Sequence, residues 1–153
     1  MLRFVFFLLM LLLSWLGFAQ KETQEAKVKQ TIENFFEGFH ARDTLSIKQT
    51  ASASPFMQTV GMDKQGNPLL QTVGFSGFLK QIASIPIEKK IEERLLSFNI
   101  QVDGNMAHAW TPYEFYVDGN FSHCGVNSFQ LFNDAGDWKI IYIIDTRRKD
   151  CGN

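Results

Sequence analysis

Hydrophobic residues recur at helical spacing between residues 22 and 41, where most other positions are polar or charged. A stripe of this kind predicts one amphipathic helix that packs against the rest of the protein by a single face. We expect the stripe to belong to the core. Its members are Val28, Ile32, Phe35, Phe36 and Phe39.

Shorter elements are predicted after this helix. Asp43 or Thr44 can cap a second, short helix, because both side chains can accept hydrogen bonds from free backbone N–H groups. Residues 55–62 and 68–73 have the pattern of two strands joined by a polar turn. Ser76 can cap a third helix.

From residue 93 onward the pattern changes to an alternation of apolar and polar positions, which is typical of antiparallel strands. Asp-Gly pairs between the runs are strong turn signals. Helices followed by a strand meander predict an α+β fold, a roll in which the helices cover one face of a strongly curved antiparallel sheet. The predicted strands are residues 93–102, 107–117, 120–132 and 138–148.

The turns also predict which residues face one another. If Asp118 and Gly119 form a two-residue turn, Glu114 pairs with His123, and a three-residue loop at the last turn then places Arg147 opposite His123. Side chains alternate between the two faces of a sheet. In this register the more apolar face, expected under the helices, carries Tyr113, Cys124, Trp138 and Tyr142, and the other carries Trp110, Glu114, His123, Asn127, Asp145 and Arg147.

The N-terminal segment is predicted to be separate from this domain. Arg3 precedes a long apolar run, and small residues follow it at the cleavage positions, which predicts a secretory signal peptide over residues 1–19 and a single domain over residues 20–153. A retained membrane anchor is the alternative, although the run is shorter than the roughly 20 residues that a spanning helix needs. We therefore expect a periplasmic or secreted protein that has no membrane attachment after cleavage.

Charge and composition narrow the function classes. Without Arg3 the mature chain has 14 basic residues (15 minus 1) against 16 acidic ones, a net charge of about −2. This balance lacks the clustered basic face of nucleic-acid-binding proteins, so we expect no nucleic-acid partner. The three histidines and two cysteines do not stand at metal-ligand spacing, so we expect no metal and no cofactor.

The strand sequences Ala-Trp-Thr-Pro-Tyr-Glu-Phe-Tyr, Ser-His-Cys-Gly-Val-Asn-Ser-Phe-Gln-Leu, Gly-Asp-Trp-Lys-Ile and Asp-Thr-Arg-Arg carry a family resemblance. Through them the chain resembles the lumazine-binding-like family of the nuclear transport factor 2-like (SnoaL-like) superfamily, most sharply over residues 107–151. The resemblance implies a cone-shaped α+β barrel with a pocket between helices and sheet, often dimeric through the sheet. It implies no particular activity, because the superfamily includes isomerases, dehydratases, epoxide hydrolases and binding proteins.

The two cysteines, Cys124 and Cys151, both remain in the mature chain, and an even count in an exported protein permits one disulfide. Both lie inside the stretch that carries the resemblance, which encourages the pairing.

Both predicted faces of the sheet are too apolar to be exposed to water. The helices account for one face, and a second copy of the chain is the simplest cover for the other. We therefore expect a homodimer through the sheet.

Two groups of residues are candidates for a site. Glu114, His123 and Arg147, with Asp145 nearby, can carry proton transfer or bind an anion, or they can form an interstrand charge ladder that fixes the register. The second group combines aromatic walls with polar tips and suits a small-molecule pocket, or consists of core residues whose polar atoms are satisfied. These ligand-binding candidates are Trp110, Tyr113, Asn127, Trp138 and Tyr142.

The leading functional expectation is an exported small-molecule-binding or accessory protein with an unknown small molecule as its partner. The alternative is a cofactor-independent acid–base enzyme, an isomerase, dehydratase or hydrolase, that acts on a small apolar substrate. A structural dimer module with a filled cone is a third reading. An enzyme should place a titratable group with a shifted pKa in the pocket. Because the predicted charged row faces away from the helices, binding is favoured.

Overall fold

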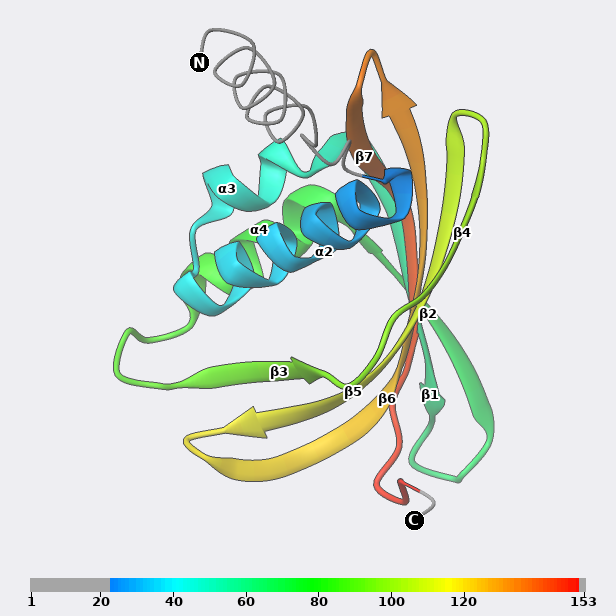
Figure 1. The fold of residues 1–153 in the computed structure, drawn as a ribbon. Coiled ribbons are helices and arrows are strands. Elements are labelled where there is room, and N and C mark those ends of the chain that lie inside the picture. The colour runs from blue at the N-terminus through cyan, green and yellow to red at the C-terminus, as the bar shows by residue number, and fades with distance from the viewer. Residues whose placement is uncertain (1–22, 152–153) are drawn as a thin grey trace, which may run out of the picture.

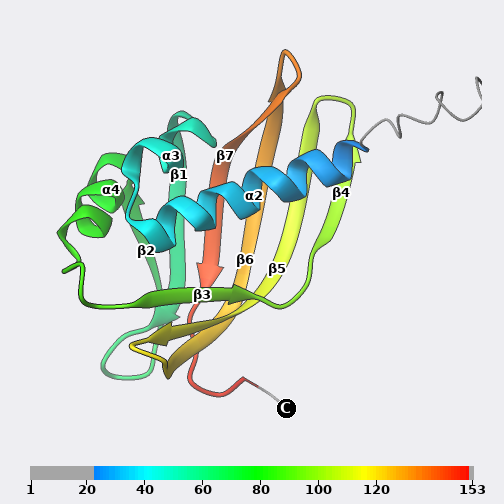
Figure 2. The same cartoon turned by 60° about the vertical axis from the view of Figure 1, so that its left-hand side comes forward.

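The computed structural model describes residues 23–151, so the predicted signal peptide, residues 1–19, lies outside the described residues. In this part of the chain, three helices cover one face of a strongly curved sheet, as Figures 1 and 2 show. The predicted α+β architecture is confirmed. Within residues 23–151, no helix combines the length and the apolar character that crossing a membrane requires.

The helices form as their patterns predict. The apolar stripe of the first helix is buried, with Val28 and Ile32 at 0% exposure. The Asp43 carboxylate accepts hydrogen bonds from the first free N–H groups of the second helix, which confirms this cap. The third helix begins one residue before Ser76, so the predicted Ser76 cap is wrong. The helices are α2 (Gln24–Ala41), α3 (Thr44–Gln49) and α4 (Phe75–Ser84).

Within residues 23–151, seven strands form one sheet in the order β2-β1-β7-β6-β5-β3, and β4 also pairs with β5. All neighbours are antiparallel except β1 and β7, which run parallel. The sequence did not predict this parallel pair, because no turn joins two segments so far apart in the chain. The strands are β1 (Ala51–Met62), β2 (Pro68–Gly74), β3 (Ile91–Leu95), β4 (Asn99–Asp103), β5 (Met106–Val117), β6 (Asn120–Asp134) and β7 (Asp137–Thr146).

The predicted single strand over residues 93–102 is wrong, since the structure divides it into β3 and β4. Both pair with β5, on either side of Pro112. Pro112 has no N–H to donate, and only its carbonyl is bonded here, by the Leu96 N–H at 2.9 Å. The ladder is interrupted at this point, and β3 runs beneath the helices while β4 follows the other half of β5 (Figure 1).

A bulge in β6 changes the predicted register. Val117 pairs with Asn120 as predicted, but Phe115, not Glu114, pairs with His123. The bulge adds one residue to β6, and a slip of one residue turns the following side chains to the other face. The predicted Glu114–His123 pair is therefore wrong.

The last hairpin also departs from the prediction. Asp134 pairs with Asp137 across a two-residue turn instead of a three-residue loop. A second register shift follows between β6 and β7, at Gln130 and Leu131 of β6. Asp145 consequently pairs with Asn127, and Arg147 lies beyond the end of β7. Together the two register shifts place His123, Asn127 and Asp145 on the face that the helices cover.

The C-terminal segment folds back onto β6. Cys124 and Cys151 are joined by a disulfide, with their Cα atoms 6.0 Å apart. Backbone hydrogen bonds of 3.0 and 2.9 Å connect Cys124 with Arg148 in both directions. Arg147, the residue between β7 and this bridge, donates its N–H to the Val60 carbonyl at 3.0 Å. The backbone of Arg147 is therefore held from both sides.

Candidate functional site

A cavity of about 310 Å³ opens between α2, α4 and the inner face of the sheet. Six phenylalanines form about half of its apolar wall. The rings of Phe35 and Phe39 lie nearly parallel to Phe78, with centroids 6.0 and 6.3 Å from it. Such walls suit a flat apolar molecule, and the volume is at the low end for small-molecule pockets. The other apolar lining residues are Phe36, Met57, Ile82, Ile85, Ile91, Phe115, Phe129 and Ile143.

Polar side chains gather where β3, β5, β6 and the end of β7 meet. Four strands contribute to this group because the curved sheet brings their inward-facing positions to one end of the cavity. The rest of the lining is apolar apart from Gln81 on α4. The polar cluster consists of Glu93, Tyr113, His123, Asn127, Asp145 and Arg147.

Asp145 lies at the centre of the polar cluster. Its carboxylate accepts hydrogen bonds from Thr59 Oγ1 at 2.5 Å, from the Tyr113 hydroxyl at 3.3 Å and from Arg147 Nε at 2.9 Å. The Tyr113 hydroxyl also lies 2.9 Å from the Thr146 carbonyl oxygen. Burial, reinforced by Asp145, raises the pKa of Tyr113 well above its ordinary value, so this hydroxyl remains a donor.

Glu93 extends from β3 into the cavity. Its Oε1 accepts a hydrogen bond from Asn127 Nδ2 at 2.7 Å. Burial raises the pKa of Glu93 to about 8; Asp145 adds to this shift, whereas the Asn127 hydrogen bond and Arg147 oppose it. The carboxyl group is thus mostly neutral at pH 7, and a neutral carboxyl group can donate its O–H.

His123 stands beside these groups on β6. Its ring lies 4.9 Å from the Phe115 ring and packs edge-on against Tyr113 at 5.9 Å. Its Nδ1 lies 3.1 Å from Ser122 Oγ. Burial, together with the positive charge of Arg147, lowers the pKa of His123. We therefore assign a neutral imidazole at pH 7.

His40 supports Glu93 from the helix side. Its Nε2 accepts the backbone N–H of Glu93 at 2.8 Å, which ties β3 to the end of α2. Accepting this bond requires an unprotonated Nε2, in agreement with the burial that lowers the pKa of His40.

The structure brings many of the predicted site residues to the cavity. Tyr113, Asn127, His123, Asp145 and Arg147 all line it. For His123, Asn127, Asp145 and Arg147 this is a correction, since the sequence placed them on the face opposite the helices. The bulge in β6 turns His123 and Asn127 inward, and the second register shift, between β6 and β7, turns Asp145 inward with them.

Four predicted site residues lie elsewhere. Glu114 accepts a hydrogen bond from the Tyr116 hydroxyl at 2.7 Å, away from the cavity lining. Trp110 is 47% exposed, and Tyr142 donates to Gln58 at 2.5 Å on the outer face, so Tyr142 is not under the helices as predicted. Trp138 is buried, but it lines a separate polar groove along α2 and α3, and its indole N–H donates to Gln24 at 3.0 Å.

Glu93 is the functional candidate that the sequence reasoning missed. It stands between Ile91 and Leu95 at every second position of β3, the arrangement that puts all three side chains on one face. A carboxylate between two inward-facing apolar residues was the available signal. Among residues 23–151, no group of three or more His, Cys, Asp or Glu side chains is arranged to hold a metal ion.

Comparisons with known proteins address the fold. No family model and no curated protein matches the chain. Among solved structures, a nuclear transport factor 2-like protein from Cytophaga hutchinsonii superposes with a TM-score of 0.66 at 11% identity, over 82% of this chain and 99% of that one. A protein from Salmonella enterica of the same superfamily gives 0.62 at 17% identity, over 84% and 93%.

A third structure, from Streptomyces avermitilis, is named as a candidate dehydratase of the nuclear transport factor 2-like family. It superposes with a TM-score of 0.62 at 13% identity, over 82% of this chain and 96% of that one. The chain therefore has the nuclear transport factor 2-like fold, as the resemblance implied. The lumazine-binding-like family within that superfamily stays a prediction.

Proposed function

We propose that this protein binds a small molecule with a flat, apolar body and one polar end in the cavity between α2, α4 and the sheet. The observation that carries the proposal is the convergence of six polar side chains in a cavity whose other walls are mostly apolar, with six phenylalanines among them. Apolar walls supply affinity, and a few placed polar groups orient the ligand. A purely structural module would fill this space with side chains.

The cavity offers a direct test with a matched pair of variants. Ile143 lines the cavity and is 6% exposed, whereas Ile141 on the same strand is 36% exposed and outside the lining. Ile143→Phe should fill the cavity and weaken binding of a neutral two-ring probe, 2-naphthamide, by about tenfold or more, at a stability cost of about 1–3 kcal/mol. Ile141→Phe should leave the affinity unchanged. Calorimetric titration measures the affinity of each variant for 2-naphthamide. Equal affinities of Ile143→Phe and Ile141→Phe would contradict the proposal.

An acid–base enzyme is the second candidate, because of one specific observation. Glu93, with a pKa of about 8, and a neutral His123 lie in the same cavity, and enzymes tune proton-transfer groups to this range. Binding comes first, because it requires no proton exchange by either group. If the protein is an enzyme, Glu93→Gln should abolish turnover of a cavity ligand and retain binding, whereas a binder leaves that ligand chemically unchanged in both forms.

We also propose that the protein works outside the cytoplasm, after removal of residues 1–19. The leader pattern supports this, and so does the Cys124–Cys151 disulfide, since such bonds persist in oxidising compartments. The intact mass of the exported protein should correspond to a chain that begins near Gln20. A membrane fraction that retains residues 1–19 would contradict cleavage.

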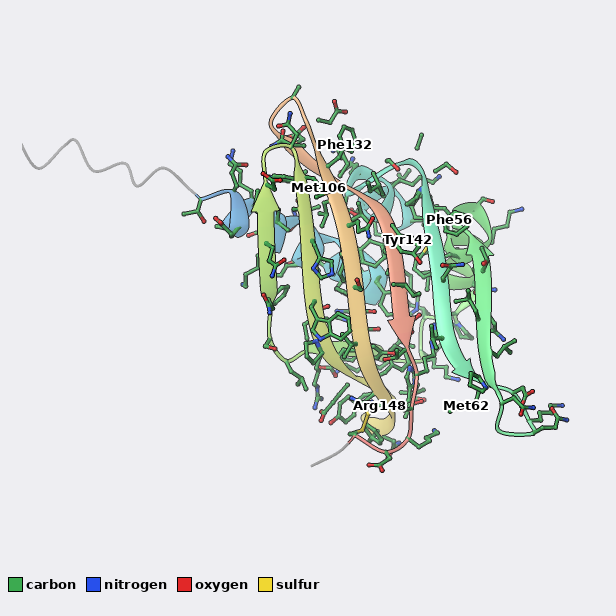
Figure 3. The ribbon with its side chains drawn as sticks, turned by 90° about the vertical axis from the view of Figure 1, so that its right-hand side faces the viewer. Phe56, Met62, Met106, Phe132, Tyr142 and Arg148 are labelled. Atoms are coloured by element: carbon green, nitrogen blue, oxygen red, sulfur yellow. A yellow bond between two sulfur atoms is a disulfide. The ribbon has the colours of Figure 1, made fainter. Side chains whose placement is uncertain are left out.

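The outer face of the sheet is the surface through which we propose that two copies associate. Large apolar side chains are exposed there, among them Phe56 (55%), Met106 (60%) and Trp110 (47%), and Figure 3 shows this face with Phe56 beside Tyr142 and Met106 near Phe132. Exposed apolar patches of this kind mark interaction sites. Trp110→Glu should shift the sedimentation mass from dimer to monomer, while Leu45→Glu, on α3, should not.

A further inference from the structure

Arg147 presents unused hydrogen-bond donors at the mouth of the cavity. Its Nε donates to Asp145, but its two terminal NH₂ groups make no hydrogen bond with any other part of residues 23–151. The side chain is 58% exposed and belongs to the cavity lining. A guanidinium with two free NH₂ groups has the planar fork that matches a carboxylate.

Asp145 does not block this use of Arg147. Its oxygens already accept hydrogen bonds from Thr59, Tyr113 and Arg147 Nε, so its charge is compensated by groups on the protein side. Asp145 therefore fixes the Nε edge of the guanidinium and leaves the terminal edge for a ligand. The backbone bonds on both sides of Arg147 add to this orientation.

Glu93 supplies a second donor at the same end. Asn127 occupies its Oε1, and the pKa of about 8 keeps the carboxyl group protonated at pH 7. A neutral carboxyl group can donate to a ligand oxygen, and the bond is strongest when the acceptor is charged. An ionised Glu93 at this position would instead repel a ligand anion.

We propose that the ligand carries a carboxylate, which binds to the free edge of Arg147 and to the Glu93 carboxylic acid, while a body of one or two rings lies against the phenylalanines. This inference deepens the proposed function and rests on it. The small cavity volume limits the size of the body, and the nearly parallel rings of Phe35, Phe39 and Phe78 favour a flat one.

The proposal predicts a pH dependence. The charged and titratable groups around Glu93 are Asp145 and Arg147 from the β7 end, His123 from β6, Tyr113 from β5 and His40 from α2. Burial raises the pKa of Glu93 to about 8, whereas it lowers the pKa of His123 and of His40 and raises the pKa of Tyr113 well above its ordinary value. Affinity for a carboxylate should therefore fall as the pH rises through about 8, and affinity for a neutral analogue should fall less.

The test compares two probes of the same shape, 2-naphthoate and 2-naphthamide, on the full mature protein. At pH 7 the wild type should bind 2-naphthoate about tenfold or more tightly than 2-naphthamide. Arg147→Gln should remove this preference and retain binding of 2-naphthamide. Arg148→Gln is the matched control, because Arg148 is the next residue, is exposed and does not line the cavity.

The outcomes separate this inference from the proposed function. Equal or weaker binding of 2-naphthoate by the wild type, with 2-naphthamide bound, would overturn the carboxylate and leave small-molecule binding in place. Binding of neither probe would contradict the proposed function itself. If Arg147→Gln does not fold, the test is the ratio of the wild-type affinities for 2-naphthoate and 2-naphthamide, measured between about pH 6 and pH 9. This ratio should fall as the pH rises, and a constant ratio would overturn the role of Glu93.

Discussion

The raised pKa of Glu93 makes the stability of the protein depend on pH in a direction that can be calculated. Folding moves this pKa from 4.5 to about 8. The folded state therefore holds a proton that the unfolded state releases, and the associated stability is fully present below pH 4.5 and is lost as the pH rises through about 8.

The magnitude follows from the size of the shift. At about 1.4 kcal/mol per pH unit, a shift from 4.5 to about 8 corresponds to about 5 kcal/mol as an upper bound. Glu93 keeps part of its surface open to the cavity, and water there lowers the cost of ionisation. We therefore expect a loss of about 2–4 kcal/mol in the free energy of unfolding between about pH 5 and pH 9.

Glu93→Gln isolates this contribution, because glutamine retains a neutral side chain that can accept from Asn127. Urea unfolding at several pH values should show the wild type losing stability relative to Glu93→Gln as the pH rises. Glu92→Gln is the control: the hydrogen bond from Arg94 lowers the pKa of Glu92 to about 2, so its titration lies outside the range. Parallel curves for the wild type and Glu93→Gln would refute the reasoning.

Three further predictions concern the framework around the site, each measured as a change in the free energy of unfolding. Gly125→Ala should cost about 3 kcal/mol or more, because the added Cβ would lie 1.8 Å from the Thr146 carbonyl oxygen. Gly61→Ala is the control and should cost little, because Gly61 has open space around it. Equal losses of stability in the two variants would contradict the close packing at Gly125. Phe129→Ala should cost about 3–5 kcal/mol, because this ring is 0% exposed, and a loss below 1 kcal/mol would contradict its place in the core. Replacing both cysteines by serine should cost about 3–4 kcal/mol for a closed loop of 27 residues, and two free thiols in oxidised, denatured wild type would show that the bond is absent.

The sequence predicted the elements better than the register. The stripe on α2 and the cap at Asp43 depend on local spacing, and the structure has both. The register of β5 and β6 depends on a bulge, and no local signal distinguishes a bulged strand from a regular one of similar composition. One such slip was enough to put His123 and Asn127 on the wrong face.

The site, like the register, was predicted only in part from the sequence, because part of it depends on long-range contacts. Tyr113, Asn127, His123, Asp145 and Arg147 were chosen for their chemistry, and all of them line the cavity. Glu93 was not chosen, because its environment comes from Asn127 and from the burial that β3 acquires beneath the helices. Long-range packing of this kind creates the shifted pKa, and its local trace is limited to the position of Glu93 between Ile91 and Leu95.

The central claim, that a small molecule occupies the phenylalanine-lined cavity, is tested most directly by the methionine methyl groups. The mature chain has three methionines: Met57 lines the cavity, whereas Met62 and Met106 are 67% and 60% exposed. Titration of ¹³C-methyl-methionine protein with 2-naphthamide or 2-naphthoate should shift the Met57 signal, because a bound ring changes the local magnetic field, and should leave the Met62 and Met106 signals in place. Shifts confined to Met62 or Met106, or no shift at saturating probe, would contradict the claim.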